Sequence, residues 1–82
     1  MKRKYPVQLS LFGEKIKDLR IGKMLTQARL AKLCGVSTRT ILRIENGEYA
    51  ATLEIILAIA QVFEITASDL LQGIKKEKST KK

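Results

Sequence analysis

GVSTRTILRIENG, at residues 35 to 47, is the stretch of this 82-residue chain that decides its fold. A helix over residues 37 to 46, turning about 100° per residue, places Ile41 and Ile44 on one side together with Ser37. The opposite side carries two arginines, a hydroxyl and a leucine: Thr38, Arg39, Leu42 and Arg43. Such a polar face either points only at water or contacts a partner, and the neighbouring residues bear on that choice.

The residues before this stretch predict a second short helix, over 27 to 34, with Thr26 as its N-cap. Only about three residues join the two helices, which is typical of a helix-turn-helix pair. Such a pair needs a small residue where the helices cross, which Ala31 supplies, and a glycine where the turn takes a positive φ, which Gly35 supplies. The apolar residues expected to pack within and between the two helices are Leu30, Cys34, Val36, Ile41 and Ile44.

The rest of the chain predicts three further helices and no strand, so the fold class is all-α. Phe12, Ile16 and Leu19 have the spacing of a helix that buries one side. A fourth helix is expected over residues 53 to 63 behind Thr52, and a fifth behind Thr66, whose spacing to Asp69 is that of a capping box.

One domain is therefore expected at residues 12 to 73, between two segments of different composition. Residues 1 to 11 are expected to be an N-terminal arm, either extended or disordered. Residues 74 to 82 form a lysine-rich tail that is expected to be disordered, because it lacks apolar side chains to offset the entropy of ordering.

The fourth helix is apolar on nearly all sides. Its core positions are expected to be Leu53, Ile56, Leu57, Ala60 and Phe63. Ile55, Ala58 and Val62 are surplus and recur at three- and four-residue steps, which predicts a contact with another subunit, since a wholly buried helix is hard to arrange in so small a domain. A competing interpretation is that residues 1 to 11 fold over this stripe.

The formal net charge is +8, and it is unevenly distributed. Residues 20 to 43 contain only basic charges, whereas residues 44 to 72 contain only acidic ones. A polyanion would be attracted to the first part and repelled by the second, so the field would orient such a partner as well as attract it. An acidic protein surface would be attracted in the same way.

The composition argues against several classes of function. The chain has no histidine and a single cysteine, Cys34, so no disulfide framework, metal site, cofactor or catalytic general base is expected, and the protein is not expected to be an enzyme. Its basic start lacks the apolar core of a signal peptide, and no apolar run is long enough to cross a membrane. We therefore expect a cytoplasmic protein without membrane contact.

The sequence LTQARLAKLCGVSTRTILRIENGE, at residues 25 to 48, resembles the helix-turn-helix domain of the phage repressor, Cro and bacterial XRE-type regulator family. The resemblance extends from about Gly13 to Leu71. It implies a five-helix, lambda-repressor-like domain whose second and third helices read double-stranded DNA in the major groove. It also implies a homodimer on a palindromic operator.

The resemblance assigns base-reading positions on the third helix. Thr38 and Arg39 match the positions that enter the major groove first, and Arg43 lies one turn further on, where relatives place either a base or a phosphate contact. Arginine donates well to guanine O6 and N7, so we expect a G·C pair in each half-site. Leu42 either touches a thymine methyl group or has no contact with DNA.

The resemblance also implies phosphate contacts. Gln27 matches the glutamine that opens the family's second helix and binds a phosphate, with help from the helix N-terminus. Arg29 stands where relatives often have acids, and it either approaches a phosphate or is merely solvated. Asn46 either approaches a phosphate or simply ends the helix, and Thr40 completes the expected phosphate set.

Arg20 and Glu45 match positions where relatives often have a partly buried ion pair between the first helix and the end of the third. The sequence as a whole predicts a DNA-binding transcriptional regulator, either a repressor or an autoregulator. The alternative is a protein-interaction module, or a toxin-linked antitoxin, that uses the same fold; a further protein partner is left open.

Overall fold

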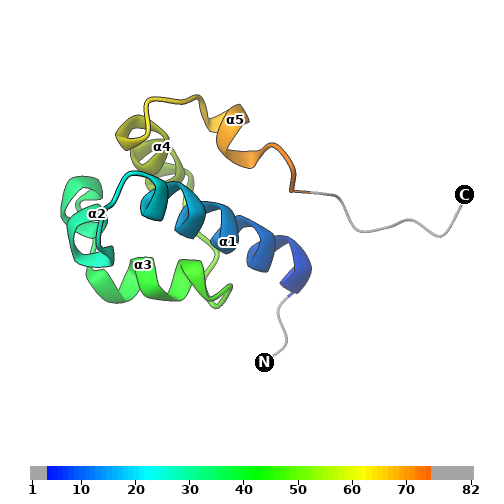
Figure 1. The fold of residues 1–82 in the computed structure, drawn as a ribbon. Helices are drawn as coiled ribbons and strands as arrows, with labels where there is room; N and C mark the ends of the chain where they lie inside the picture. Colours follow the sequence, from blue (N-terminus) through cyan, green and yellow to red (C-terminus); the bar gives the residue numbers. More distant parts are fainter. Residues whose placement is uncertain (1–3, 75–82) are drawn as a thin grey trace, which may run out of the picture.

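The computed structural model describes residues 4–74, and within them it contains five α-helices and no strand (Figure 1). This confirms the all-α prediction. α1 lies centrally, with α3 below it, α4 and α5 above it and α2 beyond one end (Figure 1). Among these residues, none of the helices has the length and hydropathy needed to cross a bilayer. The helices are α1 (Pro6–Gly22), α2 (Gln27–Cys34), α3 (Thr38–Glu45), α4 (Leu53–Val62) and α5 (Ala67–Leu71).

Four helices begin at a hydroxyl side chain, as the sequence predicts. In each, the oxygen accepts a hydrogen bond from the backbone N–H three residues further on, which satisfies a donor that the first turn leaves free. The donor–acceptor distances range from 2.9 Å in α5 to 3.2 Å in α4. Thr66 also completes a capping box with Asp69. The four caps are Thr26, Ser37, Thr52 and Thr66.

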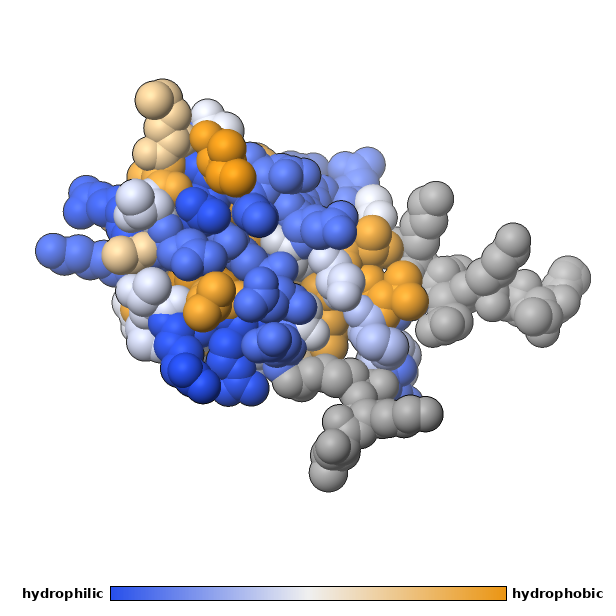
Figure 2. Space-filling model, turned by 60° about the horizontal axis from the view of Figure 1, so that its bottom comes forward, coloured by the Kyte–Doolittle hydropathy of each residue, from blue (hydrophilic) through white to orange (hydrophobic). Residues whose placement is uncertain are grey.

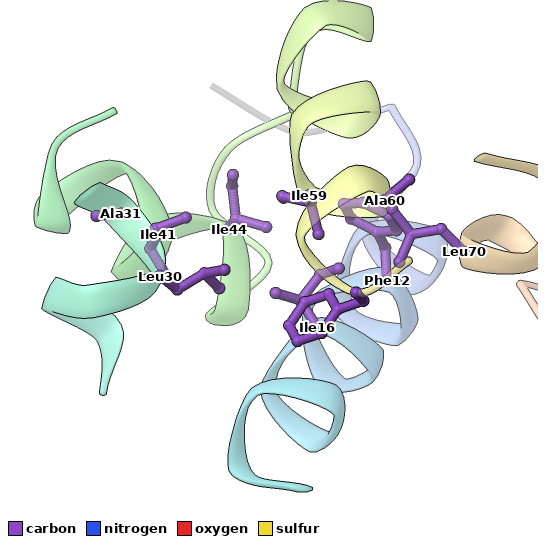
Figure 3. Close-up of a cluster of buried hydrophobic side chains, with 10 residues drawn as sticks. Phe12, Ile16, Leu30, Ala31, Ile41, Ile44, Ile59, Ala60 and Leu70 are labelled. Atoms are coloured by element: carbon purple, nitrogen blue, oxygen red, sulfur yellow. The ribbon is translucent and has the colours of Figure 1, made fainter. Parts of the chain in front are cut away.

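The core is a cluster of apolar side chains contributed by all five helices. Leu30 and Ala31 of α2 lie against Ile41 of α3 at one end of the cluster, and Phe12 and Ile16 of α1 lie against α4 at the other (Figure 3). The side chains with no exposed surface are Ile16, Leu30, Ile41, Ile44, Ile59 and Leu70. Burial of these side chains supplies most of the driving force for folding.

α1 begins at Pro6, six residues before the start that the periodicity predicts. Proline suits the first helical position because its φ is already helical and its missing N–H would have no partner there. Residues 6–11, assigned above to a separate arm, are therefore the first turns of α1. The predicted tail lies outside the described residues except for Ile74, which is half-buried.

α4 is rotated relative to the prediction. Leu53 and Leu57, which were expected in the core, are 68% and 51% exposed, whereas Ile59 is fully buried. Ala60 and Phe63 are buried as expected. Because nearly every side of α4 is apolar, the sequence pattern does not determine which side faces inward; the packing against α1, α2 and α5 does.

The short helix α5 is attached to α1 through one lysine. The Lys15 ammonium donates hydrogen bonds to the backbone carbonyl oxygens of Asp69 and Gln72, at 2.7 Å and 2.6 Å. These carbonyls lie at the C-terminal end of α5, where a positive charge is favourable.

Candidate nucleic-acid interface

The turn between α2 and α3 has the geometry that a helix-turn-helix requires. Gly35 has a left-handed conformation, with φ at +73°, and the next residue, Val36, donates its N–H to the carbonyl of Ala31 at 3.0 Å. A side chain at Gly35 would be strained by this backbone conformation. The predicted bounds of α2 are confirmed, and α3 occupies residues 38–45 of the predicted 37–46.

The inner side of α3 is fixed closely against α1. Gly13 is buried on α1, and a Cβ atom added there would overlap the carbonyl oxygen of Ile44 and lie 2.7 Å from that of Glu45. The backbones of the two helices therefore approach at a point where only glycine fits. Ile41 and Ile44 are fully buried on the same side of α3.

Arg20 and Glu45, the residues expected to pair, form a bidentate ion pair. Arg20 Nε donates to Glu45 Oε2 at 2.7 Å and Nη2 donates to Oε1 at 3.1 Å, while Nη1 donates to the carbonyl of Leu25 at 2.8 Å. The two side chains are only 12% and 2% exposed. Through these contacts Arg20 joins α1 to the α1–α2 turn and to the end of α3. Removing either partner of the ion pair would leave a desolvated charge.

Gln27 joins this network, which the sequence did not indicate. Its amide Nε2 donates to Glu45 Oε1 at 3.0 Å. The first residue of α2 is thereby attached to the end of α3. The second N–H of this amide and the backbone N–H groups of Gln27 and Ala28 remain as donors that could meet an anion.

The outer side of α3 is polar and exposed. Thr38 and Arg39 are exposed at its N-terminal end, and Leu42 is 41% exposed. Among residues 4–74, no hydrogen bond or ion pair is found for the Arg39 guanidinium. Hydrophilic residues cover most of the face that carries α3, with small hydrophobic patches between them (Figure 2).

Arg43 differs from Arg39. It is half-buried, and its guanidinium carbon lies 6.0 Å from the centroid of the Tyr49 ring. Tyr49 belongs to the loop between α3 and α4. The sequence gives no periodic signal for this contact, because the two residues meet only when the chain turns back after α3.

The remaining residues of the expected phosphate set are placed differently from one another. Arg29 and Asn46 are exposed, on α2 and at the end of α3. Thr40 is half-buried, and its hydroxyl is hydrogen-bonded to that of Ser37 at 2.9 Å. All three residues lie on the α2–α3 side of the domain.

The stripe expected to contact another subunit is partly covered. Ile55, Ala58 and Val62 are half-buried, and Ile55 and Val62 pack against the core. Ala58 and Val62 line a shallow hollow with Leu33 of α2 and Gln61. Residues 6–11 do not lie on this hollow; Gln8 and Leu9 instead line an apolar groove on the side of α4 that carries Ile56.

The described residues show no constellation for metal binding, since no group of three or more histidine, cysteine, aspartate or glutamate side chains gathers among residues 4–74. Cys34 is half-buried at the end of α2, and burial raises the pKa of its thiol. A raised pKa makes the thiolate scarce at neutral pH, so this cysteine is a poor nucleophile.

The geometry is that of a helix-turn-helix domain, and comparison with known proteins places it in a family. The helix-turn-helix family model HTH_3 matches residues 16–70. The chain therefore belongs to the XRE-type helix-turn-helix family of phage repressor and Cro-like DNA-binding transcriptional regulators. Members of this family are in general regulators rather than enzymes.

Individual relatives agree with this assignment. The chain is 39% identical over 62 residues to the transcriptional activator BcrR of Enterococcus faecalis, a match that covers 76% of this chain and 30% of that protein. The restriction-modification controller C.AhdI of Aeromonas hydrophila has a similar structure, with a TM-score of 0.73, 32% identity and coverage of 76% and 94% of the two chains. The P22 c2 repressor, solved in complex with a synthetic operator, gives a TM-score of 0.71 at the same identity and coverage.

The chain spans less than half the length of the first three curated relatives that it matches. The similarity therefore concerns the DNA-binding domain that the proteins share.

Proposed function

We propose that this protein binds double-stranded DNA sequence-specifically through the major groove and regulates transcription, as a repressor or autoregulator, from a palindromic operator. The observation that carries this proposal is the division of α3 into two sides. Ile41 and Ile44 are fully buried, while Thr38 and Arg39 are exposed at the N-terminal end, where recognition helices contact base edges.

Within this proposal, specificity and affinity come from different residues. Thr38, Arg39 and, by its exposure, Leu42 are the base-reading candidates, and Arg39 is the one whose guanidinium is free to take a bidentate geometry on guanine. Gln27, Arg29, Asn46 and Thr40 are the phosphate candidates, which set the register on the duplex without reading sequence. Arg20 and Glu45 set the angle of α3.

The proposed assembly is a homodimer through α4. The hollow between Leu33, Ala58 and Val62 supports this, because it leaves apolar surface of α2 and α4 open to a partner. Two copies related by a two-fold axis would place two reading helices on the two halves of a palindrome.

Selection of binding sites from a random duplex pool, followed by titration at rising salt, tests DNA binding. We expect a palindromic consensus with a G·C pair in each half-site, and an affinity that falls steeply as salt rises. If the protein bound no duplex even at low salt, the proposal would be wrong and the basic side of the domain would have another acidic target.

Sedimentation tests the assembly. Ala58→Glu adds a charge to the hollow without removing a core side chain, so we expect the dimer mass of the wild-type protein to fall to that of a monomer. Glu54→Gln, at an exposed position of the same helix, should leave the mass unchanged. A wild-type protein that sediments as a monomer at every concentration would contradict the dimer.

A further inference from the structure

The contact between Arg43 and Tyr49 restricts one of the two arginines on α3. A guanidinium within about 6 Å of a ring centroid is attracted by the negative face of the ring. In this protein that distance is 6.0 Å, and both residues are half-buried. Arg39, one turn earlier, is exposed and has no such neighbour among the described residues.

The loop that carries Tyr49 is held in place from two sides. Gly47 turns the chain with a φ of +74°, and Glu48 donates its N–H to the carbonyl of Arg43 at 2.8 Å, which folds the loop back over the last turn of α3. On its other side, Tyr49 packs against the hydrophobic core. The ring is therefore a fixed support and not a mobile neighbour.

The contact draws the Arg43 guanidinium toward the loop at the C-terminal end of α3. Recognition helices contact base edges mainly with their N-terminal residues, so the opposite end of α3 lies nearer to the sugar–phosphate backbone. A guanidinium held beside a ring at this distance keeps its N–H groups available to donate to phosphate oxygens.

We propose that Tyr49 is a positioning residue that holds Arg43 ready for a phosphate at the border of the major groove. This inference rests on the proposed function, and it assigns Arg43 to the backbone and Arg39 to the bases. Holding a long side chain in its bound geometry before association reduces the conformational entropy lost on binding.

A double-mutant cycle on the selected operator tests the inference, with Tyr49→Leu, Tyr49→Phe, Arg43→Ala and the Arg43→Ala/Tyr49→Leu double variant. Tyr49→Leu should weaken binding about two- to fivefold for each half-site, which corresponds to the strength of an exposed cation–π pair. Tyr49→Phe keeps the ring and should bind nearly as the wild-type protein does. In the Arg43→Ala background, Tyr49→Leu should have no further effect.

Two further measurements separate positioning from general loss of structure. Arg43→Ala should reduce the slope of log affinity against log salt by about 0.9 per half-site, the value for one phosphate contact, and leave the preferred bases unchanged. The side-chain protons of Arg43 should show upfield ring-current shifts in NMR spectra of the free protein, retained in Tyr49→Phe and lost in Tyr49→Leu.

The outcomes that would overturn the inference are distinct from those against the proposed function. Equal weakening by the Leu and Phe variants, no weakening by either, or a Leu effect that persists without Arg43 would each refute positioning. A change in preferred bases with Arg43→Ala would refute the backbone assignment. A wild-type protein that binds no duplex would refute the proposed function, and this inference with it.

Discussion

α3 and α4 follow one another in the chain, but they differ in how clearly their polar and apolar side chains are separated. α3 is polar on one side and apolar on the other, with Ile41 and Ile44 fully buried and Arg39 exposed. α4 is apolar on nearly all sides, so Leu53 and Leu57 remain exposed although they are apolar like the buried Ile59. When polar and apolar residues lie on separate sides of a helix, the sequence determines which side faces the core. When a helix is apolar on nearly all sides, the packing of neighbouring helices determines it.

The largest effect is expected at the buried end of α3. Glu45→Gln removes the carboxylate that faces Arg20 and leaves a desolvated guanidinium, which should lower the free energy of unfolding by about 3 to 5 kcal/mol. Urea denaturation would measure it. Glu48→Gln is the matched control, because Glu48 is exposed a few residues further on and its loss should change stability by less than about 0.5 kcal/mol. Similar losses in both variants would mean that the ion pair does not hold α3.

The core of α4 should respond according to the observed rotation and not the predicted one. Ile59→Ala leaves a cavity at a fully buried position and should cost about 2 to 5 kcal/mol. Leu57→Ala removes a half-exposed side chain and should cost less than about 1 kcal/mol, by the area it takes from water. Thermal or urea unfolding of the two variants would compare them directly, and a larger loss at Leu57 would contradict the placement of α4.

Close contact between backbones should distinguish two glycines of α1. Gly13→Ala forces a methyl group against the carbonyls of α3, so we expect a loss of about 1 to 3 kcal/mol in urea unfolding. Gly22→Ala, in the same helix, meets no atom within 4 Å and should instead stabilise the protein by about 0.5 to 1 kcal/mol. If both variants were stabilised, α1 and α3 would lie further apart than described.

The outer side of α3 should matter for binding and not for folding. Arg39→Ala should change stability by less than about 0.5 kcal/mol, because the side chain is exposed. In competition binding, we compare the selected operator with a DNA in which the expected G·C pair is replaced. Arg39→Ala should reduce the difference in binding free energy between these two DNAs by about 1 to 3 kcal/mol. Lys32 is an exposed basic residue of α2, and Lys32→Ala should leave that preference unchanged. A loss that is equal on all sequences would make Arg39 a backbone contact.

The parts of the fold that are determined locally were predictable from the sequence. The hydroxyl caps and Gly35 act through hydrogen bonds and backbone angles within a few residues, so α2 has the expected limits and α3 differs from them by one residue at each end. The start of α1 was missed because Tyr5 supplies no side-chain cap, and because the turns after it pack against residues distant in sequence, such as Gly47 next to Ser10.

The same distinction applies to the candidate interface. The exposed positions Thr38 and Arg39 follow from helical periodicity alone. The contacts of Gln27 with Glu45 and of Arg43 with Tyr49 arise where separate segments converge, and no spacing rule marks them. The residue types were therefore informative about what the surface can bind. The structure was needed to show which of these side chains contact other parts of the protein.

The hydrogen bonds of Lys15 have a consequence for how the domain opens. α5 has five residues, far below the length at which a helix is stable by itself in water, so its order depends on the contacts made by Leu70 and on the lysine of α1. Partial unfolding should therefore begin with α5, and its amide protons should exchange with solvent sooner than those of α2 and α3. Such an opening would loosen α5 while α3 keeps its contacts with Arg20 and Gly13.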